Sequence, residues 1–261
     1  DMKFTIDKRE EIDSPNLEVI RRAKTGAPEG TLVQAERQIS GRGRRGRAWE
    51  SPAGSNLYMT LLLRPDVTME QASVLIMALA CQEGIKEATG LDCQIKWPND
   101  LVLHKKKVVG ILTEAAMLEQ DEAFPEGGTQ KEHPYALACG VGINVNQKEF
   151  PEEIREIAGS LKLSAGHPVA RAGLIASIME ELEDLYEVFL KTEDLSALKD
   201  EYNRNCVTCG HEIRVLEPGH EYTGMTDGIN DLGELVVKKA DGETVCVYAG
   251  EVSVRGLYGY V

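Results

Sequence analysis

The stretch Gly-Arg-Gly-Arg-Arg-Gly-Arg at residues 41–47, called the arginine loop below, is the most unusual segment of this sequence and limits the folds that are possible for it. It formally satisfies the G-x-G-x-x-G pattern of dinucleotide-binding folds, in which a helix opens directly after the glycines and points its N-terminus at a pyrophosphate. Pro52 and Gly54 follow closely here, and a segment with these residues does not continue as a helix. No G-x-x-x-x-G-K-[ST] pattern occurs either. The sequence therefore argues against a Rossmann domain and against a P-loop.

The arginine loop stands out because the chain as a whole is acidic. Acidic residues number 43 against 29 basic ones, which gives a net charge of −14. Long-range repulsion from DNA or from an anionic membrane surface therefore argues against a protein that binds either polyanion in general. Arginine forks suit phosphate and carboxylate oxygens, and each such contact contributes about 1.5–3 kcal/mol. The loop alone indicates an anion site, with a solvated basic loop or a nucleic-acid patch as the alternatives.

Length and cysteine usage bound the class of protein. The 261 residues suffice for one large domain or for one domain plus a small appendage. No apolar run approaches the ~18–20 residues that a bilayer requires, and the N-terminus has no apolar signal core. Six cysteines make no disulfide scaffold, and the pair Cys206 and Cys209, with His211 nearby, lacks a second ligand pair for zinc. We expect a soluble, cytoplasmic protein with reduced thiols.

The pattern of apolar residues predicts an α+β fold. Ser14 can cap a helix that Pro15 opens, and this helix ends near Gly26. Residues 101–103 and 108–112 read as a hairpin with a charged turn, and residues 123–134 read as an exposed loop. The other expected strands are residues 31–35, 56–63, 92–97 and 135–145, and the other expected helices are residues 69–88, 168–190 and 195–202.

The pattern of the sequence changes after about Cys209. Short strand-like runs follow, with Asp227-Gly228 and Asp241-Gly242 as hairpin signals between them. We therefore expect two domains: residues 1–208, and a small β-barrel at residues 209–261.

Two further clusters can take part in chemistry. The first is Lys96-Trp-Pro-Asn99-Asp100, followed by Lys107 at the start of the return arm of the hairpin. An Asn-Asp pair beside a strand end can bind a metal ion or orient a nucleophile, and a nearby lysine adds an anion contact. Taken alone, Asn99-Asp100 is typical of a turn, and the lysine run 105–107 is typical of an exposed hairpin tip. The second is the small-residue run 140–146, Gly-Val-Gly-Ile-Asn-Val-Asn, which lets a planar ligand lie against the backbone.

Taken together, these residues resemble the biotin protein ligases, also called biotin–[acetyl-CoA-carboxylase] ligases. The resemblance covers residues 14–146, and the run 250–255 is similar to the closing strand of that family. It rests on the ordered segments 14–16 (Ser-Pro-Asn), Gln38 with the arginine loop, Trp49, 55–58 (Ser-Asn-Leu-Tyr), 96–100, Lys107 with 110–112 (Gly-Ile-Leu) and 142–146.

The resemblance implies a mixed sheet with flanking helices, like that of class II tRNA synthetases, plus a small C-terminal SH3-like β-barrel. It implies an ATP-dependent, AMP-forming ligase that converts biotin to biotinyl-5′-AMP. A lysine of a biotin carboxyl carrier domain then accepts the biotin. Magnesium is expected on the ATP phosphates, with Asp100 as an alternative ligand. We expect no DNA or membrane partner and leave the choice between a monomer and a homodimer open.

The resemblance also implies roles for individual residues. Arg44 and Lys107 would hold the biotin carboxylate and the α-phosphate, and Asp100 would position or deprotonate the incoming lysine. The implied biotin-binding residues are Ser14, Pro15, Asn16, Gln38, Arg42, Gly43, Arg44 and Lys107. The implied ATP-binding or adenylate-binding residues are Arg47, Trp49, Lys96, Asn99 and Asn144.

One departure and two alternatives qualify the resemblance. The family usually has Ser or Thr where this chain has Pro15, which supplies no hydroxyl and no N–H, so any donation to the biotin ring there is lost. A lipoate or octanoate ligase of the same superfamily is one alternative, although the arginine loop and residues 96–100 favour biotin. A truncated biotin-responsive repressor is another. Since only 13 residues precede Ser14, we expect a short form without an N-terminal helix-turn-helix domain.

Overall fold

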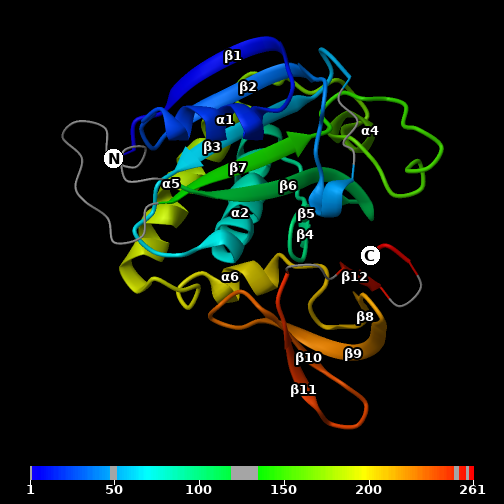
Figure 1. Cartoon of the computed structure of the whole chain (residues 1–261). Helices are drawn as coiled ribbons and strands as arrows, with labels where there is room; N and C mark the ends of the chain where they lie inside the picture. Colours follow the sequence, from blue (N-terminus) through cyan, green and yellow to red (C-terminus); the bar gives the residue numbers. More distant parts are fainter. Residues whose placement is uncertain (1, 48–51, 119–134, 250–252, 257–258) are drawn as a thin grey trace.

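A seven-stranded mixed sheet forms the centre of the larger of two units (Figure 1). The computed structural model describes residues 2–47, 52–118, 135–249, 253–256 and 259–261. The strands lie in the order β1-β2-β3-β7-β6-β5-β4. Their bounds are β1 Thr5–Ile12, β2 Thr31–Gln38, β3 Leu57–Leu63, β4 Gln94–Lys96, β5 Asp100–Leu103, β6 Lys106–Met117 and β7 Tyr135–Ile143. Only β1 and β2 pair in parallel, so the expected mixed sheet is confirmed.

Helices cover both faces of this sheet. Helix α1 (Pro15–Lys24) connects β1 to β2 and packs Val19 and Ala23 on one face. Helices α2 (Glu70–Thr89) and α5 (Leu174–Thr192) lie against each other on the other face. Gly84 permits this close approach, because a Cβ at that position would lie 2.7 Å from the Cα of Ile178.

The alternation of side chains along β7 decides where a ligand can enter. Leu137, Cys139, Val141 and Ile143 belong to the core under α2 and α5. The positions between them point to the α1 face, where the residues change from alanine near Met117 to glycine at positions 140 and 142. The α1 face is therefore filled at one end of β7 and open at the other.

The second unit is a five-stranded antiparallel sheet with the order β11-β10-β9-β8-β12, as expected for an SH3-like domain. Helices α4 (Leu161–Ala165) and α6 (Lys199–Arg204) precede it. Its strands are β8 His211–Glu217, β9 His220–Ile229, β10 Leu235–Lys238, β11 Thr244–Val247 and β12 Ser253–Gly256.

The two units are joined through β4. The Ile95 N–H donates to the Asn205 carbonyl at 2.7 Å, and the Val207 N–H donates back to Ile95 at 2.8 Å. The Trp97 indole donates to the Gly233 carbonyl at 3.1 Å. The chain's end returns to the junction of the two units (Figure 1).

Several local expectations need correction. Strand β1 and helix α4 were not expected, α5 begins at Leu174 rather than at residue 168, and α6 begins at Lys199 rather than at residue 195. Helix α1 opens at Pro15 as predicted, but Ser14 makes no side-chain cap hydrogen bond. The expected polar loop at residues 123–134 lies outside the described residues. Within the described chain, no helix has the length and apolarity needed to cross a membrane.

Candidate active site

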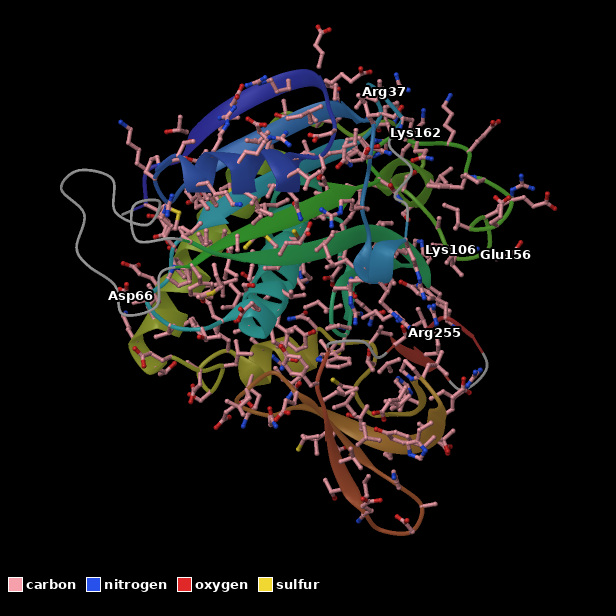
Figure 2. The ribbon with its side chains drawn as sticks, viewed as in Figure 1. Arg37, Asp66, Lys106, Glu156, Lys162 and Arg255 are labelled. Atoms are coloured by element: carbon pink, nitrogen blue, oxygen red, sulfur yellow. The ribbon has the colours of Figure 1, made fainter. Side chains whose placement is uncertain are left out.

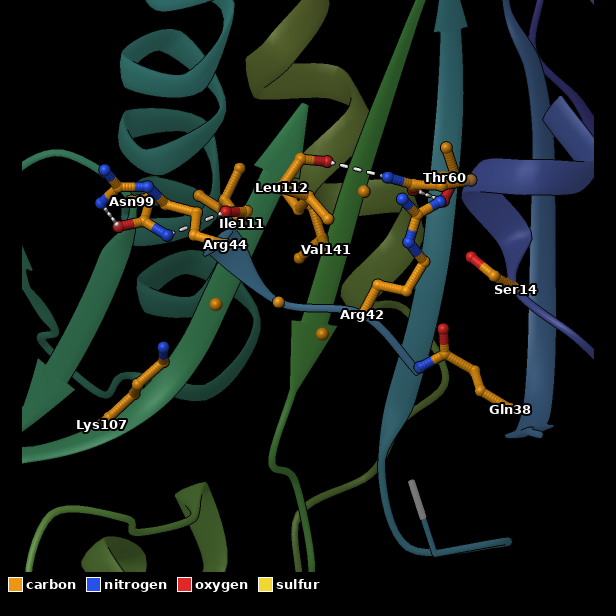
Figure 3. Close-up of a pocket in the computed structure, with 15 residues that line it drawn as sticks. Ser14, Gln38, Arg42, Arg44, Thr60, Asn99, Lys107, Ile111, Leu112 and Val141 are labelled. Atoms are coloured by element: carbon orange, nitrogen blue, oxygen red, sulfur yellow. Dashed lines mark hydrogen bonds between the residues drawn. The ribbon is translucent and has the colours of Figure 1, made fainter. Parts of the chain in front are cut away.

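A first cavity opens on the α1 face of the sheet, over the glycines of β6 and β7. Ser14 reaches it from the start of α1, Gln38 reaches it from the end of β2, and Arg42 and Arg44 of the arginine loop border it (Figure 3). Asn16 of α1 also lines it. Its complete lining is Ser14, Asn16, Gln38, Arg42, Gly43, Arg44, Thr60, Asn99, Lys107, Gly110, Ile111, Leu112, Gly140, Val141 and Gly142.

Asn16 organises one end of this cavity. Its amide nitrogen donates to the Leu112 carbonyl and to Glu114 Oε1, both at 3.1 Å. Its amide oxygen accepts from Thr60 Oγ1 at 2.5 Å. A Cβ at Gly140 would lie 2.2 Å from this oxygen, so the side chain fits only because residue 140 is glycine. Glu114 also pairs with Arg42 at 3.1 Å, which links the arginine loop to the same network.

A second cavity lies between the hairpin, the arginine loop and the C-terminal unit. The two cavities share Gly43, Arg44, Asn99 and Lys107. The rest of the second lining is Arg45, Arg47, Lys96, Trp97, Pro98, Asp100, Asn144, Gln147, Phe150, Pro151, Glu153, Ile154, Ile157, Ala158, Ser253, Val254, Arg255 and Tyr260.

The boundary between the cavities carries two fixed cations. Arg44 donates to Asn99 Oδ1 at 3.2 Å and to the carbonyl oxygen of Ala249. Asn99 is itself anchored, because its side-chain amide donates to the Ile111 carbonyl at 3.0 Å. Lys107 Nζ lies 2.8 Å from Asp100 Oδ1. An anionic group placed at this boundary would therefore meet positive charge whose position is already set.

Burial and charge act together on Lys96 and Asp100. Burial lowers the pKa of Lys96 to about 8, although the nearby Asp100 opposes the shift. Burial alone would raise the pKa of Asp100, but the positive charges of Lys107 and Lys96 outweigh it and hold this pKa below its ordinary value. Asp100 is therefore an ionised counter-ion at neutral pH.

The structure brings most of the predicted site residues together. Seven of the eight residues assigned to biotin line the first cavity, namely Ser14, Asn16, Gln38, Arg42, Gly43, Arg44 and Lys107. Pro15 does not line it and instead opens helix α1. Arg47, Lys96, Asn99 and Asn144, which were assigned to the nucleotide, all line the second cavity. Trp49 lies outside the described residues.

Two expectations about this region are wrong in detail. Lys107 is not an exposed hairpin tip: it belongs to β6, its side chain is 23% exposed, and it pairs with Asp100. Asp100 is not open to a protein substrate at a strand end, since its side chain is 10% exposed. Arg42 and Arg44 both have partners within the protein.

Sequence reasoning missed several contributors. Thr60 and Glu114 complete the Asn16 network, yet each sits in a strand where its polarity suggests only surface alternation. The second cavity also takes Ser253, Arg255 and Tyr260 from the C-terminal unit. Ser253 and Arg255 belong to the run 250–255, which the resemblance includes without assigning it a role, and Tyr260 follows no motif. Only the tertiary fold brings the three residues to β4 and β5.

A resident metal site finds no support. The described residues contain no group of three or more His, Cys, Asp or Glu side chains placed to hold a metal ion. Asp100 is already engaged by Lys107 and by the hydroxyl of Tyr260. Cys206 and Cys209 flank a turn in which the Cys209 N–H donates to the Cys206 carbonyl at 3.3 Å.

Comparisons with known proteins agree with this arrangement. The Biotin/lipoate A/B protein ligase family matches residues 10–121, and the Biotin protein ligase C terminal domain matches residues 208–255. The biotin--[acetyl-CoA-carboxylase] ligase of Paracoccus denitrificans is 31% identical over 94% of this chain and 98% of its own.

Two more relatives extend the comparison. The bifunctional ligase/repressor BirA of Bacillus subtilis is 37% identical over 84% of this chain, which spans 65% of that relative's length. The structure of biotin protein ligase from Aquifex aeolicus in complex with biotin and ATP superposes with a TM-score of 0.79 at 27% identity, over 96% of this chain and 98% of that one. With both of its units matched and its two cavities joined at Arg44 and Lys107, the chain belongs to the biotin protein ligase family.

Proposed function

We propose that this chain is an ATP-dependent ligase that activates biotin as biotinyl-5′-AMP and transfers it to a lysine of a biotin carboxyl carrier domain. One observation carries the proposal: the first cavity meets the second at Arg44, Asn99 and Lys107. Biotin in the first cavity and ATP in the second would bring a carboxylate and an α-phosphate together there. The fixed cations offset the repulsion between these two anions in the transition state.

The reaction then follows in two steps. A carboxylate oxygen of biotin attacks the α-phosphorus, the bond to the β-phosphate oxygen breaks, and pyrophosphate leaves. The carrier lysine, in its neutral form, attacks the biotinyl carbonyl carbon, and AMP leaves while the nitrogen loses a proton. Arg44 and Lys107 stabilise charge in the first step, and Asp100 keeps Lys107 in place.

Magnesium belongs to this proposal only as part of the substrate MgATP, since the described residues offer no acidic cluster to hold it. We also propose a cytoplasmic location, which the six free cysteines support.

The proposal is tested with purified protein, biotin, MgATP and a carrier domain. We expect pyrophosphate release that depends on biotin, and a single biotinylated carrier lysine identified by mass spectrometry. Lipoate and octanoate are tested in parallel. Faster modification with either acid than with biotin would replace this proposal with the lipoate-ligase alternative.

Lys107→Ala sharpens this test. Without its ammonium, adenylate formation should slow by roughly 10²–10³-fold, the usual loss for one preorganised electrostatic group. Lys105→Ala is the matched control, because Lys105 is exposed at the adjacent turn. Equal rates in the two variants would return Lys107 to a purely structural role.

A further inference from the structure

The side chain of Tyr260, next to the end of the chain, forms part of the wall of the second cavity. Its hydroxyl donates to Asp100 Oδ2. The Lys96 ammonium lies 4.5 Å from the centre of its ring, and the Arg255 guanidinium carbon lies 5.0 Å from the same point. Figure 2 shows Arg255 between the larger sheet and the smaller one.

These contacts complete the surroundings of two buried charges. Lys96 donates to the Val254 carbonyl at 2.8 Å, and the ring of Tyr260 covers the same ammonium. Asp100 is held between Lys107 on one oxygen and the Tyr260 hydroxyl on the other. Of these partners, the carbonyl and the tyrosine come from the C-terminal unit and the chain's end.

The ring borders the second cavity without filling it, because the cavity is open with this side chain in place. None of the first cavity's lining comes from this part of the chain. A substitution at Tyr260 should therefore affect ATP binding and the charged side chains at the boundary between the two cavities, and it should leave biotin binding unchanged.

We propose that Tyr260 is a positioning residue for adenylate formation. Its hydroxyl fixes Asp100, and through Asp100 it fixes Lys107. Its ring holds the Lys96 ammonium toward the second cavity, where ATP would bind. This inference rests on the proposed function, because it assigns ATP to the second cavity.

The test separates the hydroxyl from the ring. In Tyr260→Phe, kcat for biotin-dependent pyrophosphate release should fall about tenfold or more, since a hydrogen bond to a charged group is lost. The KM for ATP should stay within about twofold, because the ring that faces Lys96 is kept. In Tyr260→Ala, the KM for ATP should also rise about fivefold or more. The KM for biotin should change less than about twofold in both variants.

Tyr248→Phe is the control, because Tyr248 is an exposed tyrosine of the same unit and lines neither cavity. Wild-type kcat in Tyr260→Phe would overturn the proposal. So would a lower KM for ATP in Tyr260→Ala, because the ring would then compete with the nucleotide.

A second measurement does not depend on activity. Acylation of lysines by acetic anhydride, read by mass spectrometry, reports how exposed Lys96 is relative to Lys105. Tyr260→Ala should speed the acylation of Lys96 several-fold, and Tyr260→Phe should not. Equal rates in all three proteins would refute the contact between the ring and Lys96. If the wild-type chain forms no biotinyl-AMP, the proposed function fails, while this labelling still decides whether Tyr260 covers Lys96.

Discussion

At the scale of single residues, the boundary between the two cavities depends on charged side chains that hold one another in place. Asp100 is ionised because Lys107 and Lys96 lie close to it, and Lys107 keeps a fixed position because Asp100 is buried beside it. Such an arrangement supplies positive charge to a ligand without a rearrangement at the moment of reaction.

Lys96 should make ATP binding depend on pH. Burial lowers its pKa to about 8, so above that pH the ligand-free protein loses this positive charge. ATP must then bind together with a proton, and its affinity should fall toward tenfold per pH unit above 8. Calorimetric titration across pH 7–10 measures this slope. Lys96→Met should flatten it, and an unchanged slope in that variant would assign the proton to another group.

The lowered pKa of Lys96 also makes the free energy of unfolding depend on pH, in a direction that can be stated. The pKa of Lys96 is lower in the folded protein than in the unfolded chain, where it takes the ordinary value of 10.5. The buried ammonium therefore lowers the free energy of unfolding below pH 8. That loss disappears as the pH rises from 8 to 10.5.

Asp100→Asn should act on the first half-reaction. Asparagine removes the charge that positions Lys107, so adenylate formation should slow by roughly 10²-fold. Transfer from purified biotinyl-adenylate should stay within a few-fold of wild type, because a carboxyl group with a lowered pKa is a weak base. Asp200→Asn, on the exposed side of α6, is the control. A variant that makes adenylate normally but transfers slowly would restore the sequence-based role of Asp100 as a base.

The residue types at the boundary between the two cavities could be predicted from the sequence, but the partners of these residues could not. The arginine loop and residues 96–100 show in the sequence the charged and polar residue types that line both cavities. The run of three lysines gives no sign that the third is half-buried on Asp100, because burial of a lysine depends on a partner elsewhere in the chain. Tyr260 has no local pattern at all.

At the scale of elements, the apolar pattern predicts the central strands and α2 well, because each has a face buried in the core. Strand β1 escapes prediction because it lies at the sheet edge and carries charged residues over most of its length. It exists through its pairing with β2, which a local pattern does not encode.

The contact between α2 and α5 predicts a cost for Gly84→Ala. The added methyl gains about 1 kcal/mol of helix propensity, but it would lie 2.7 Å from the Ile178 Cα. Overpacking against backbone costs about 1–3 kcal/mol, which outweighs this gain, so the free energy of unfolding should fall by up to about 2 kcal/mol. Urea denaturation measures this change. Glu87→Ala, exposed on the same helix, should shift stability by less than about 0.5 kcal/mol, and a stabilised Gly84→Ala protein would contradict the close packing.

At the scale of the whole molecule, the two units share one hydrophobic core. Ile213, Val215 and Leu235 of the smaller sheet belong to the same buried cluster as Trp97 and Leu75. We therefore expect a single thermal transition, with calorimetric and van't Hoff enthalpies that agree. Trp97→Phe, which loses the bond to Gly233, should lower the midpoint while the transition stays single. Two resolved transitions in the wild type would show that the units unfold independently.

The two edges of the larger sheet bear on how the protein behaves in concentrated solution. An uncovered strand edge invites strands of other chains to add to it. At β4 the backbone of residues 205–207 covers that edge, and at β1 any added strand must desolvate Lys8, Arg9, Glu10 and Glu11. With a net charge of −14, mutual repulsion between molecules reinforces this barrier at neutral pH. Light scattering from a concentrated sample should therefore stay flat near pH 7 and rise as the pH approaches the isoelectric point of about 4.9. At that pH the net charge is close to zero, so the protein molecules no longer repel one another.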